Sequence, residues 1–279
     1  MRRNLNTYTV MILLFVLILM GAGVLDGLLS DTLYYLAFIL PPVLGILVDN
    51  RIRRAEAEHD REYPEPENLL SFDKGGVKML APCVFPTVLI ILGISYLTAF
   101  IITSLTGVER AVDVGGSLPI ALLEHALVPT LLEELLFRFM PMRMLARYGT
   151  RFTVIVSSVY FALAHTSLFS IPYALVAGVI FMILDIVCES IWPSVILHFI
   201  NNAVSVLLLF FAGSESAVSA ILISLSVISA VSVVFVIIMK KTYAKEIKRV
   251  LLSSGDGSVG YTPIALAVPT LFIAMAEFM

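Results

Sequence analysis

Nine long apolar runs constrain this chain more than any other feature. They cover residues 9–30, 33–48, 79–107, 118–140, 152–169, 173–187, 193–212, 217–239 and 263–279. About 20 apolar residues cross a bilayer as an α-helix. With 59% hydrophobic and only 14% charged residues, the 279-residue chain carries too much apolar side chain for a soluble domain. We therefore expect an all-α fold, a polytopic transmembrane helix bundle integral to the membrane.

The number of crossings depends on the weakest runs. The second run is short and contains Pro41 and Pro42, and the last contains Pro269 and Glu277. Either could be tilted or interfacial instead of a full crossing. We predict about eight transmembrane helices, with run 263–279 as the candidate ninth.

Basic residues give the expected orientation. They cluster at residues 2–3, 51–78, 143–151 and 240–249, that is, before the first run and then between alternate pairs of runs. Nine crossings with a cytoplasmic N-terminus place all these clusters on the cytoplasmic side, as the positive-inside rule requires. The first run lacks a clear cleavage site and is predicted to be an uncleaved anchor. We expect membrane lipids as partners and no nucleic acid, because the net charge is −3 and no nucleic-acid motif occurs.

Titratable and amide side chains are concentrated in the middle runs. Within residues 118–212 they are Glu124, His125, Glu133, Glu134, Arg138, His165, Asp185, Glu189, His198, Asn201 and Asn202. A charged side chain at the centre of a membrane helix costs about 2.5–3.5 kcal/mol on insertion scales. The presence of each charged residue in these runs therefore needs an explanation. We predict that residues 118–212 form an intramembrane core that holds the site. Residues 1–117 contribute N-terminal helices with a solvated linker at 49–78, and residues 213–279 contribute C-terminal helices.

Two adjacent glutamates begin the polar pattern. Glu133 and Glu134 point about 100° apart on a helix, so they cannot face one cavity equally. Arg138 follows Glu134 by four residues, a favourable spacing for an ion pair. We predict that Glu134 pairs with Arg138 and that Glu133 is free for chemistry. The alternative is a purely structural ion-pair cluster.

Two histidines are expected to join these carboxylates. Gly149 and Thr150 mark a turn equidistant from Glu134 and His165, so these two side chains should lie at equal depth in an antiparallel helix pair and meet. His198 and Asn202 share one helix face, which could stabilise an oxyanion, while Asn201 should point elsewhere. A straight preceding helix would leave His198 about 9 Å deeper than His165. The alternatives are a hydrogen-bonded core histidine and ordinary interhelical hydrogen bonding.

Two further charged pairs receive no catalytic role. Glu124 and His125 belong to no complete zinc motif and are expected to line the far end of the cavity. Asp185 and Glu189 precede Trp192, and we expect them at the cytoplasmic boundary of the membrane. No internal repeat occurs, which disfavours a secondary transporter.

In order, the chain contains Glu133-Glu134-x-x-x-Arg138, Phe161-x-x-x-His165 and His198-x-x-Asn201-Asn202. This series resembles the three motifs of the CAAX protease and bacteriocin-processing family, which includes the type II CAAX prenyl endopeptidases. The resemblance covers about residues 131–205, with one departure at Phe139, where many members have glycine.

The resemblance implies an intramembrane endopeptidase. Glu133 and His165 would activate a water molecule, His198 and Asn202 would stabilise the oxyanion, and Glu134 and Arg138 would order the first motif. Its partners would be peptide or protein substrates, among them prenylated or otherwise lipidated ones. The expected location is a prokaryotic cell membrane. There, peptide precursors would be an alternative to lipidated substrates.

No metal cofactor is expected, because a general base needs no ion and asparagine is a poor zinc ligand. If an ion is present, zinc held by Glu133, His165 and His198 is the alternative. Two other functions stay open: a non-catalytic immunity or scaffold protein of the same fold, and a transporter that uses the polar cluster as an ion path.

Overall fold

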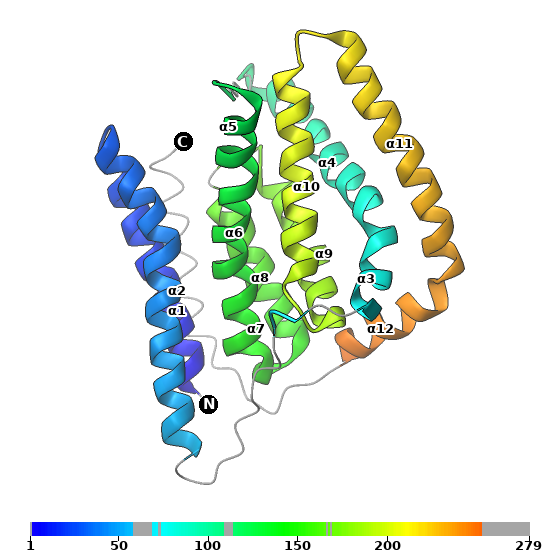
Figure 1. The fold of residues 1–279 in the computed structure, drawn as a ribbon. Helices are drawn as coiled ribbons and strands as arrows, with labels where there is room; N and C mark the ends of the chain where they lie inside the picture. Colours follow the sequence, from blue (N-terminus) through cyan, green and yellow to red (C-terminus); the bar gives the residue numbers. More distant parts are fainter. Residues whose placement is uncertain are drawn as a thin grey trace.

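The computed structural model describes residues 2–57, 69–71, 74–108, 114–165, 167 and 169–252, and almost all of them are helical (Figure 1). No strand occurs among these residues. The α-helices are α1 (Arg2–Gly23), α2 (Leu28–Ala57), α3 (Lys74–Leu80), α4 (Val84–Thr106), α5 (Leu118–Leu122), α6 (Val128–Glu134), α7 (Met140–Leu145), α8 (Thr150–Ala164), α9 (Ile171–Cys188), α10 (Trp192–Phe210), α11 (Glu215–Ile238) and α12 (Lys240–Leu252). Short 3₁₀ or π turns connect several of them: η1 (Ala81–Cys83), η2 (Leu123–Leu127), η3 (Leu135–Phe139) and η4 (Ala146–Tyr148).

The predicted polytopic helical bundle is confirmed. Six helical segments are long and apolar enough to cross a membrane: Asn4–Gly23, Leu28–Ala55, Gly76–Thr106, Ile171–Cys188, Trp192–Phe210 and Glu215–Ile238. The two other apolar runs on described residues also form helices, one of them the shorter α8 and the other the series from α5 to α7. The candidate ninth run, 263–279, lies outside the described residues.

The helix that carries the two glutamates alternates between α and π turns. The π turns η2 and η3 are each followed by a proline near the start of the next α segment, Pro129 in α6 and Pro141 in α7. Proline cannot donate to the helical ladder and collides with the preceding turn, and a widened turn accommodates it. The helix therefore continues through both prolines, and η3 begins directly after Glu134.

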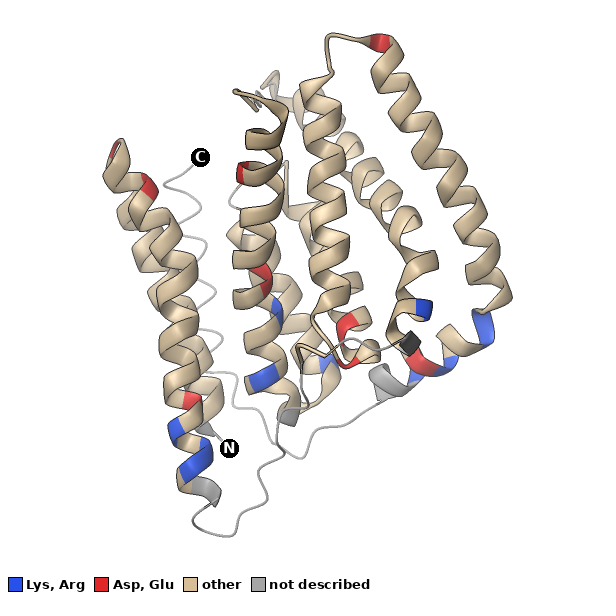
Figure 2. Cartoon of the chain, viewed as in Figure 1, with Lys and Arg blue, Asp and Glu red and all other residues tan. Residues whose placement is uncertain are grey.

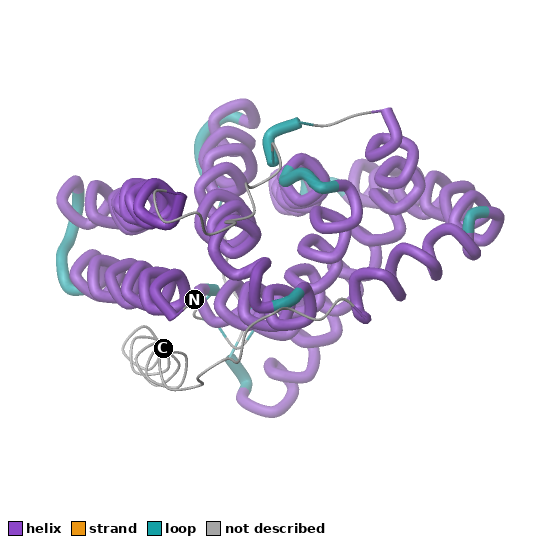
Figure 3. Tube along the Cα trace, turned by 90° about the horizontal axis from the view of Figure 1, so that it is seen from below, coloured by secondary structure: helices purple, strands orange, loops and turns teal. Residues whose placement is uncertain are grey.

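Helices α1 and α2 form a pair that stands beside the remaining helices (Figures 1 and 3). One end of this hairpin is tied to the core by Asp49, which is completely buried. Its carboxylate accepts hydrogen bonds from Asn4 Nδ2 at 3.2 Å, Arg53 Nε at 2.7 Å and, in α7, Arg143 Nε at 2.6 Å. We call these four residues the hairpin clamp.

The hairpin clamp corrects one expectation. The predicted solvated linker was to begin at residue 49, but α2 continues to Ala57 and Asp49 is buried in an ion-pair cluster. The mixed charges of this segment had suggested solvation, whereas Arg143, 94 residues further along the chain, supplies the partner that burial requires.

The clamp yields a prediction about stability. Asp49→Ala is expected to lower the free energy of unfolding by about 2 kcal/mol, because two arginines lose a charge-assisted acceptor. SDS-titrated unfolding in micelles would measure this change. Asp31→Ala, an exposed acidic residue on the same helix, is the matched control and should stay within about 0.5 kcal/mol of wild type. Equal stability of the two variants would contradict the proposed clamp.

Basic residues gather toward one end of the bundle, on the last turns of α2, on α7 and on α12 (Figure 2). Helix α12 is held there by Tyr243, whose hydroxyl donates to the Met79 carbonyl at 2.7 Å. This segregation is what the positive-inside rule describes. The cytoplasmic position of this end stays a prediction.

Candidate functional site

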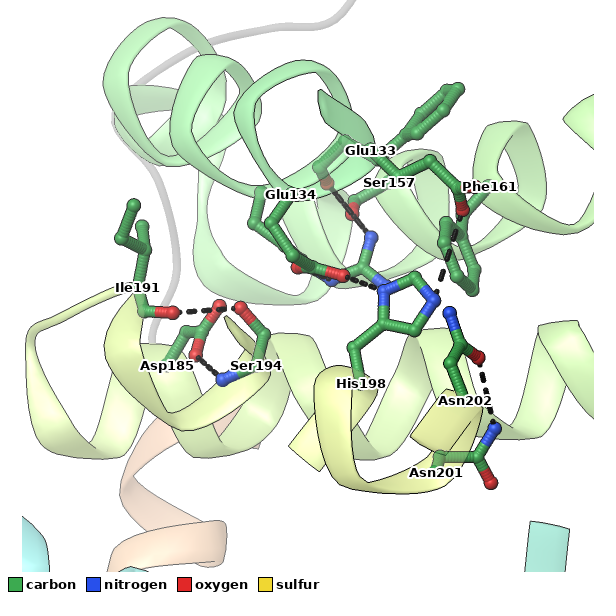
Figure 4. A network of polar contacts seen from close by, with 12 residues as sticks. Glu133, Glu134, Ser157, Phe161, Asp185, Ile191, Ser194, His198, Asn201 and Asn202 are labelled. Carbon is green, nitrogen blue, oxygen red and sulfur yellow. Dashed lines mark hydrogen bonds and ion pairs between the residues drawn. The ribbon is translucent and has the colours of Figure 1, made fainter. Parts of the chain in front are cut away.

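Polar side chains from three helical segments meet inside the bundle (Figure 4). Glu133 and Glu134 end α6, His165 directly follows α8, and His198 lies near the middle of α10. Each is surrounded mainly by apolar side chains, so their interactions with one another are poorly screened.

Glu134 is the structural centre of this group. Its side chain is 1% exposed, and Oε2 lies 3.3 Å from Nε of Arg138, so the predicted ion pair is confirmed. Its other oxygen, Oε1, accepts a hydrogen bond of 2.7 Å from Nδ1 of His198. The predicted meeting of Glu134 with His165 is wrong. Glu134 faces α10, and its neighbour Glu133 faces His165 because adjacent residues point about 100° apart.

Glu133 faces both histidines. Its Oε2 lies 4.0 Å from Nε2 of His165 and 3.9 Å from Nε2 of His198. This oxygen has no hydrogen-bond partner among the described residues, and the side chain is 15% exposed. Glu133 is thus the carboxylate without a structural partner, as the sequence predicts.

Both histidine rings are oriented through Nδ1. His165 Nδ1 lies 2.8 Å from the carbonyl oxygen of Phe161, and His198 Nδ1 contacts the Glu134 carboxylate. Carbonyl and carboxylate oxygens only accept, so Nδ1 is the donor in each ring. In the neutral form each Nε2 therefore presents a lone pair toward Glu133. Three acceptors converge on one point, where a water molecule could donate to two of them.

Phe161 packs against the same group. Its ring meets the rings of His165 and His198 edge to face, with centroid distances of 4.7 and 5.5 Å. The Arg138 guanidinium lies 4.3 Å from the Phe161 ring centroid. This arrangement explains a phenylalanine one turn before His165, because one aromatic side chain fixes two imidazoles and a cation.

Arg138 is fully buried and reaches beyond Glu134. Its Nη1 donates to the Phe137 carbonyl at 3.0 Å and to Ser157 Oγ at 3.3 Å. Ser157 also donates to the Phe137 carbonyl. Sequence reasoning missed Ser157, because one serine in an apolar helix carries no signal of its own.

The two asparagines of α10 share one cavity, which corrects the expectation that Asn201 points elsewhere. Asn201 Nδ2 donates to Asn202 Oδ1 at 3.4 Å, and both residues line the cavity. Figure 4 shows the Asn202 nitrogen on the side of His198. The Asn202 oxygen is occupied by its neighbour, so its NH₂ group is the part available to a ligand.

The expected 9 Å difference in depth between the histidines is also wrong, because both Nε2 atoms lie within 4.0 Å of one Glu133 oxygen. The expected difference assumed a straight helix between the segments that carry the two histidines. In the structure α8 ends at Ala164 and α9 begins only at Ile171, so the intervening turn absorbs the difference.

Glu133 can be reached from two sides. A cavity of about 480 Å³ contains Glu133, both histidines and both asparagines, and extends between apolar side chains of α4, α9 and α10. Cavities of about 660 and 360 Å³ reach Glu133 from the α1–α2 side and share Tyr34 and Phe38. Glu124 and His125 line the 660 Å³ cavity, and His125 also borders the 480 Å³ cavity, which agrees with their expected position.

Asp185 lies near the end of α9, close to the turn that leads into Trp192 and Pro193. Its position relative to the membrane boundary stays a prediction. Asp185 is completely buried, and its Oδ1 accepts a hydrogen bond of 2.8 Å from the backbone N–H of Ser194. Glu189, with φ of 52°, ends α9 in a left-handed conformation. The chain reverses immediately after it, and the exposed Glu189 and the buried Ser190 lead from the end of α9 to the start of α10.

If an ion binds in this cluster, Glu133, His165 and His198 would be its ligands. Their donor types suit zinc, and hydrogen bonds at both Nδ1 atoms resemble the outer partners of metal-binding histidines. Within the described part of the chain, no three His, Cys, Asp or Glu side chains stand close enough together to hold a metal ion.

Comparison with known proteins supports the sequence resemblance. Residues 115–204 match the family model described as type II CAAX prenyl endopeptidase Rce1-like. This segment includes the glutamate pair, both histidines and both asparagines. Searches of curated proteins and of solved structures found no match.

Proposed function

We propose that this chain, which belongs to the CAAX protease family through residues 115–204, is an intramembrane endopeptidase. Its substrates are membrane-associated or lipidated peptides and proteins. The observation that carries the proposal is one partly accessible carboxylate, Glu133, facing two oriented imidazoles inside a cavity.

Glu133 and His165 activate the attacking water in this mechanism. A water molecule between their acceptor atoms donates one hydrogen to each, which orients an oxygen lone pair toward the cavity. As the oxygen attacks the scissile carbonyl, Glu133 takes the proton. It then delivers that proton to the nitrogen of the leaving amine, and the bond between carbonyl carbon and nitrogen breaks.

Asn202 and His198 stabilise the tetrahedral oxyanion. Asn202 donates through Nδ2, the end of its amide that Asn201 does not use. His198 already donates through Nδ1 to Glu134, so it can donate through Nε2 only as the imidazolium. In this assignment Glu134 has a second task beyond ordering the first motif, because its carboxylate compensates the positive ring.

The substrate can be identified by comparing the membrane peptides of strains with and without an active copy of the protein. A strain lacking the gene is complemented with wild type or with Glu133→Gln, and membrane peptides are quantified by mass spectrometry. We expect precursors to accumulate in the deletion strain and to disappear only with wild type. Equal complementation by both versions would favour a scaffold or transport function instead.

Metal independence is a further prediction. We expect purified protein to retain cleavage after treatment with 1,10-phenanthroline, because Glu133 and His165 can activate water without an ion. Metal content is measured on protein purified without chelator. Stoichiometric zinc whose removal abolishes cleavage, and whose return restores it, would overturn this prediction.

A further inference from the structure

Asp185 is a buried carboxylate to which the mechanism above gives no part. It lies near the end of α9 and is completely buried. A buried charge is costly unless donors compensate it. The donor that the structure provides is the backbone N–H of Ser194, 2.8 Å from Oδ1. Asp185 therefore joins α9 to the first turn of α10.

The first turn of α10 lacks an ordinary cap. The first N–H groups of a helix need acceptors from outside the helix. Ile191 occupies the capping position and has no side-chain acceptor, and Pro193 has no N–H. Ser190 Oγ accepts from the N–H of Trp192 at 3.3 Å, and Asp185 accepts from that of Ser194. A side-chain oxygen of α9 thus performs the capping function for α10.

This cap lies one turn from the site. Ser194 precedes His198 by four residues, so both lie on one face of α10, and both are buried. The Ser194 hydroxyl donates to the Ile191 carbonyl at 2.9 Å. Movement of this turn would displace His198 from its 2.7 Å contact with Glu134.

We propose that Asp185 is a positioning residue: it caps α10 from α9 and thereby holds His198 against Glu134. Its effect on cleavage rests on the proposed endopeptidase function. Its effect on the first turn of α10 does not, so the two can be tested separately.

The chain contains its own reporter for this turn. Trp192 is the only tryptophan, and it lies two residues before Ser194. Its indole Nε1 donates to the Leu70 carbonyl at 2.8 Å, and the residue is 39% exposed. Loosening of the turn should therefore change the emission maximum of the protein and the access of a quencher to the indole.

Three variants of the full-length protein test the proposal. Asp185→Ala removes the acceptor, and Asp185→Asn keeps an oxygen that can accept from Ser194. Ser214→Ala removes a cap of α11, where Ser214 Oγ accepts from the N–H of Ala217, and serves as the matched control. Tryptophan emission, acrylamide quenching, kcat and KM are measured for each.

For Asp185→Ala we expect at least twofold stronger quenching of Trp192 and at least a tenfold lower kcat, with KM within about twofold of wild type. Asp185→Asn should return the quenching of Trp192 to the wild-type value and kcat to within about threefold of wild type, and Ser214→Ala should change neither. Wild-type emission and kcat in Asp185→Ala would overturn the proposal, as would an Asn variant as impaired as the Ala variant. If wild type cleaves nothing, the proposed function fails, and the quenching data still decide the role of Asp185 as a cap.

Discussion

Glu133→Gln is expected to lower kcat for peptide cleavage by about a thousandfold, because general-base catalysis typically contributes a rate factor of this size. Glutamine preserves the size of the side chain but cannot take a proton from water. The contacts of Glu134 with Arg138 and His198 do not involve Glu133, so folding should be unaffected. The measurement is the initial rate of peptide cleavage by purified protein in micelles, with unfolding recorded on the same samples.

Glu124→Gln is the matched control for this variant. Glu124 lies on the same helix series and lines the cavity that approaches Glu133 from α2, but it is not close to either histidine of the site. Its rate should stay within about threefold of wild type. Equal losses in the two variants would show that removing a carboxylate from this helix series affects binding or folding instead of the chemical step.

Arg138→Leu is expected to lower the free energy of unfolding by about 3–5 kcal/mol, the cost of breaking a buried ion pair. Arg138 is fully buried, and its loss leaves the buried Glu134 carboxylate without its cation, while the hydrogen bond from His198 Nδ1 remains. The cation that lies over the Phe161 ring also disappears. SDS-titrated unfolding in micelles measures the effect.

A double variant separates charge from packing. In Glu134→Gln combined with Arg138→Met, no unpaired charge remains, while the glutamine oxygen still accepts from His198 Nδ1. We expect it to recover at least half of the stability lost in Arg138→Leu. A double variant less stable than the single one would mean that packing, not the unpaired charge, causes the loss.

Spacing along the sequence predicted contacts within one helix. The four-residue interval between Glu134 and Arg138 suffices for an ion pair, and the structure contains it. The apolar runs likewise predicted the helices, because lipid leaves the backbone few alternatives.

Contacts between helices were harder to predict, because they depend on turns that periodicity does not reveal. The side chains that meet His165 and His198 depend on which way each glutamate faces and on a non-helical turn after α8. The contact between Asp185 and the Ser194 N–H was not predicted, because it depends on the reversal of the chain after Glu189. Asp49 was assigned to a linker because its partner Arg143 is remote in the sequence.

The central claim is that Glu133 makes this chain a peptidase. The most direct test incubates membranes from a deletion strain with purified wild type or Glu133→Gln, labels newly formed N-termini and identifies them by mass spectrometry. We predict a small set of new termini within or beside transmembrane or lipidated segments, present with wild type and absent with Glu133→Gln. The same termini with both proteins, or none with wild type, would contradict the claim.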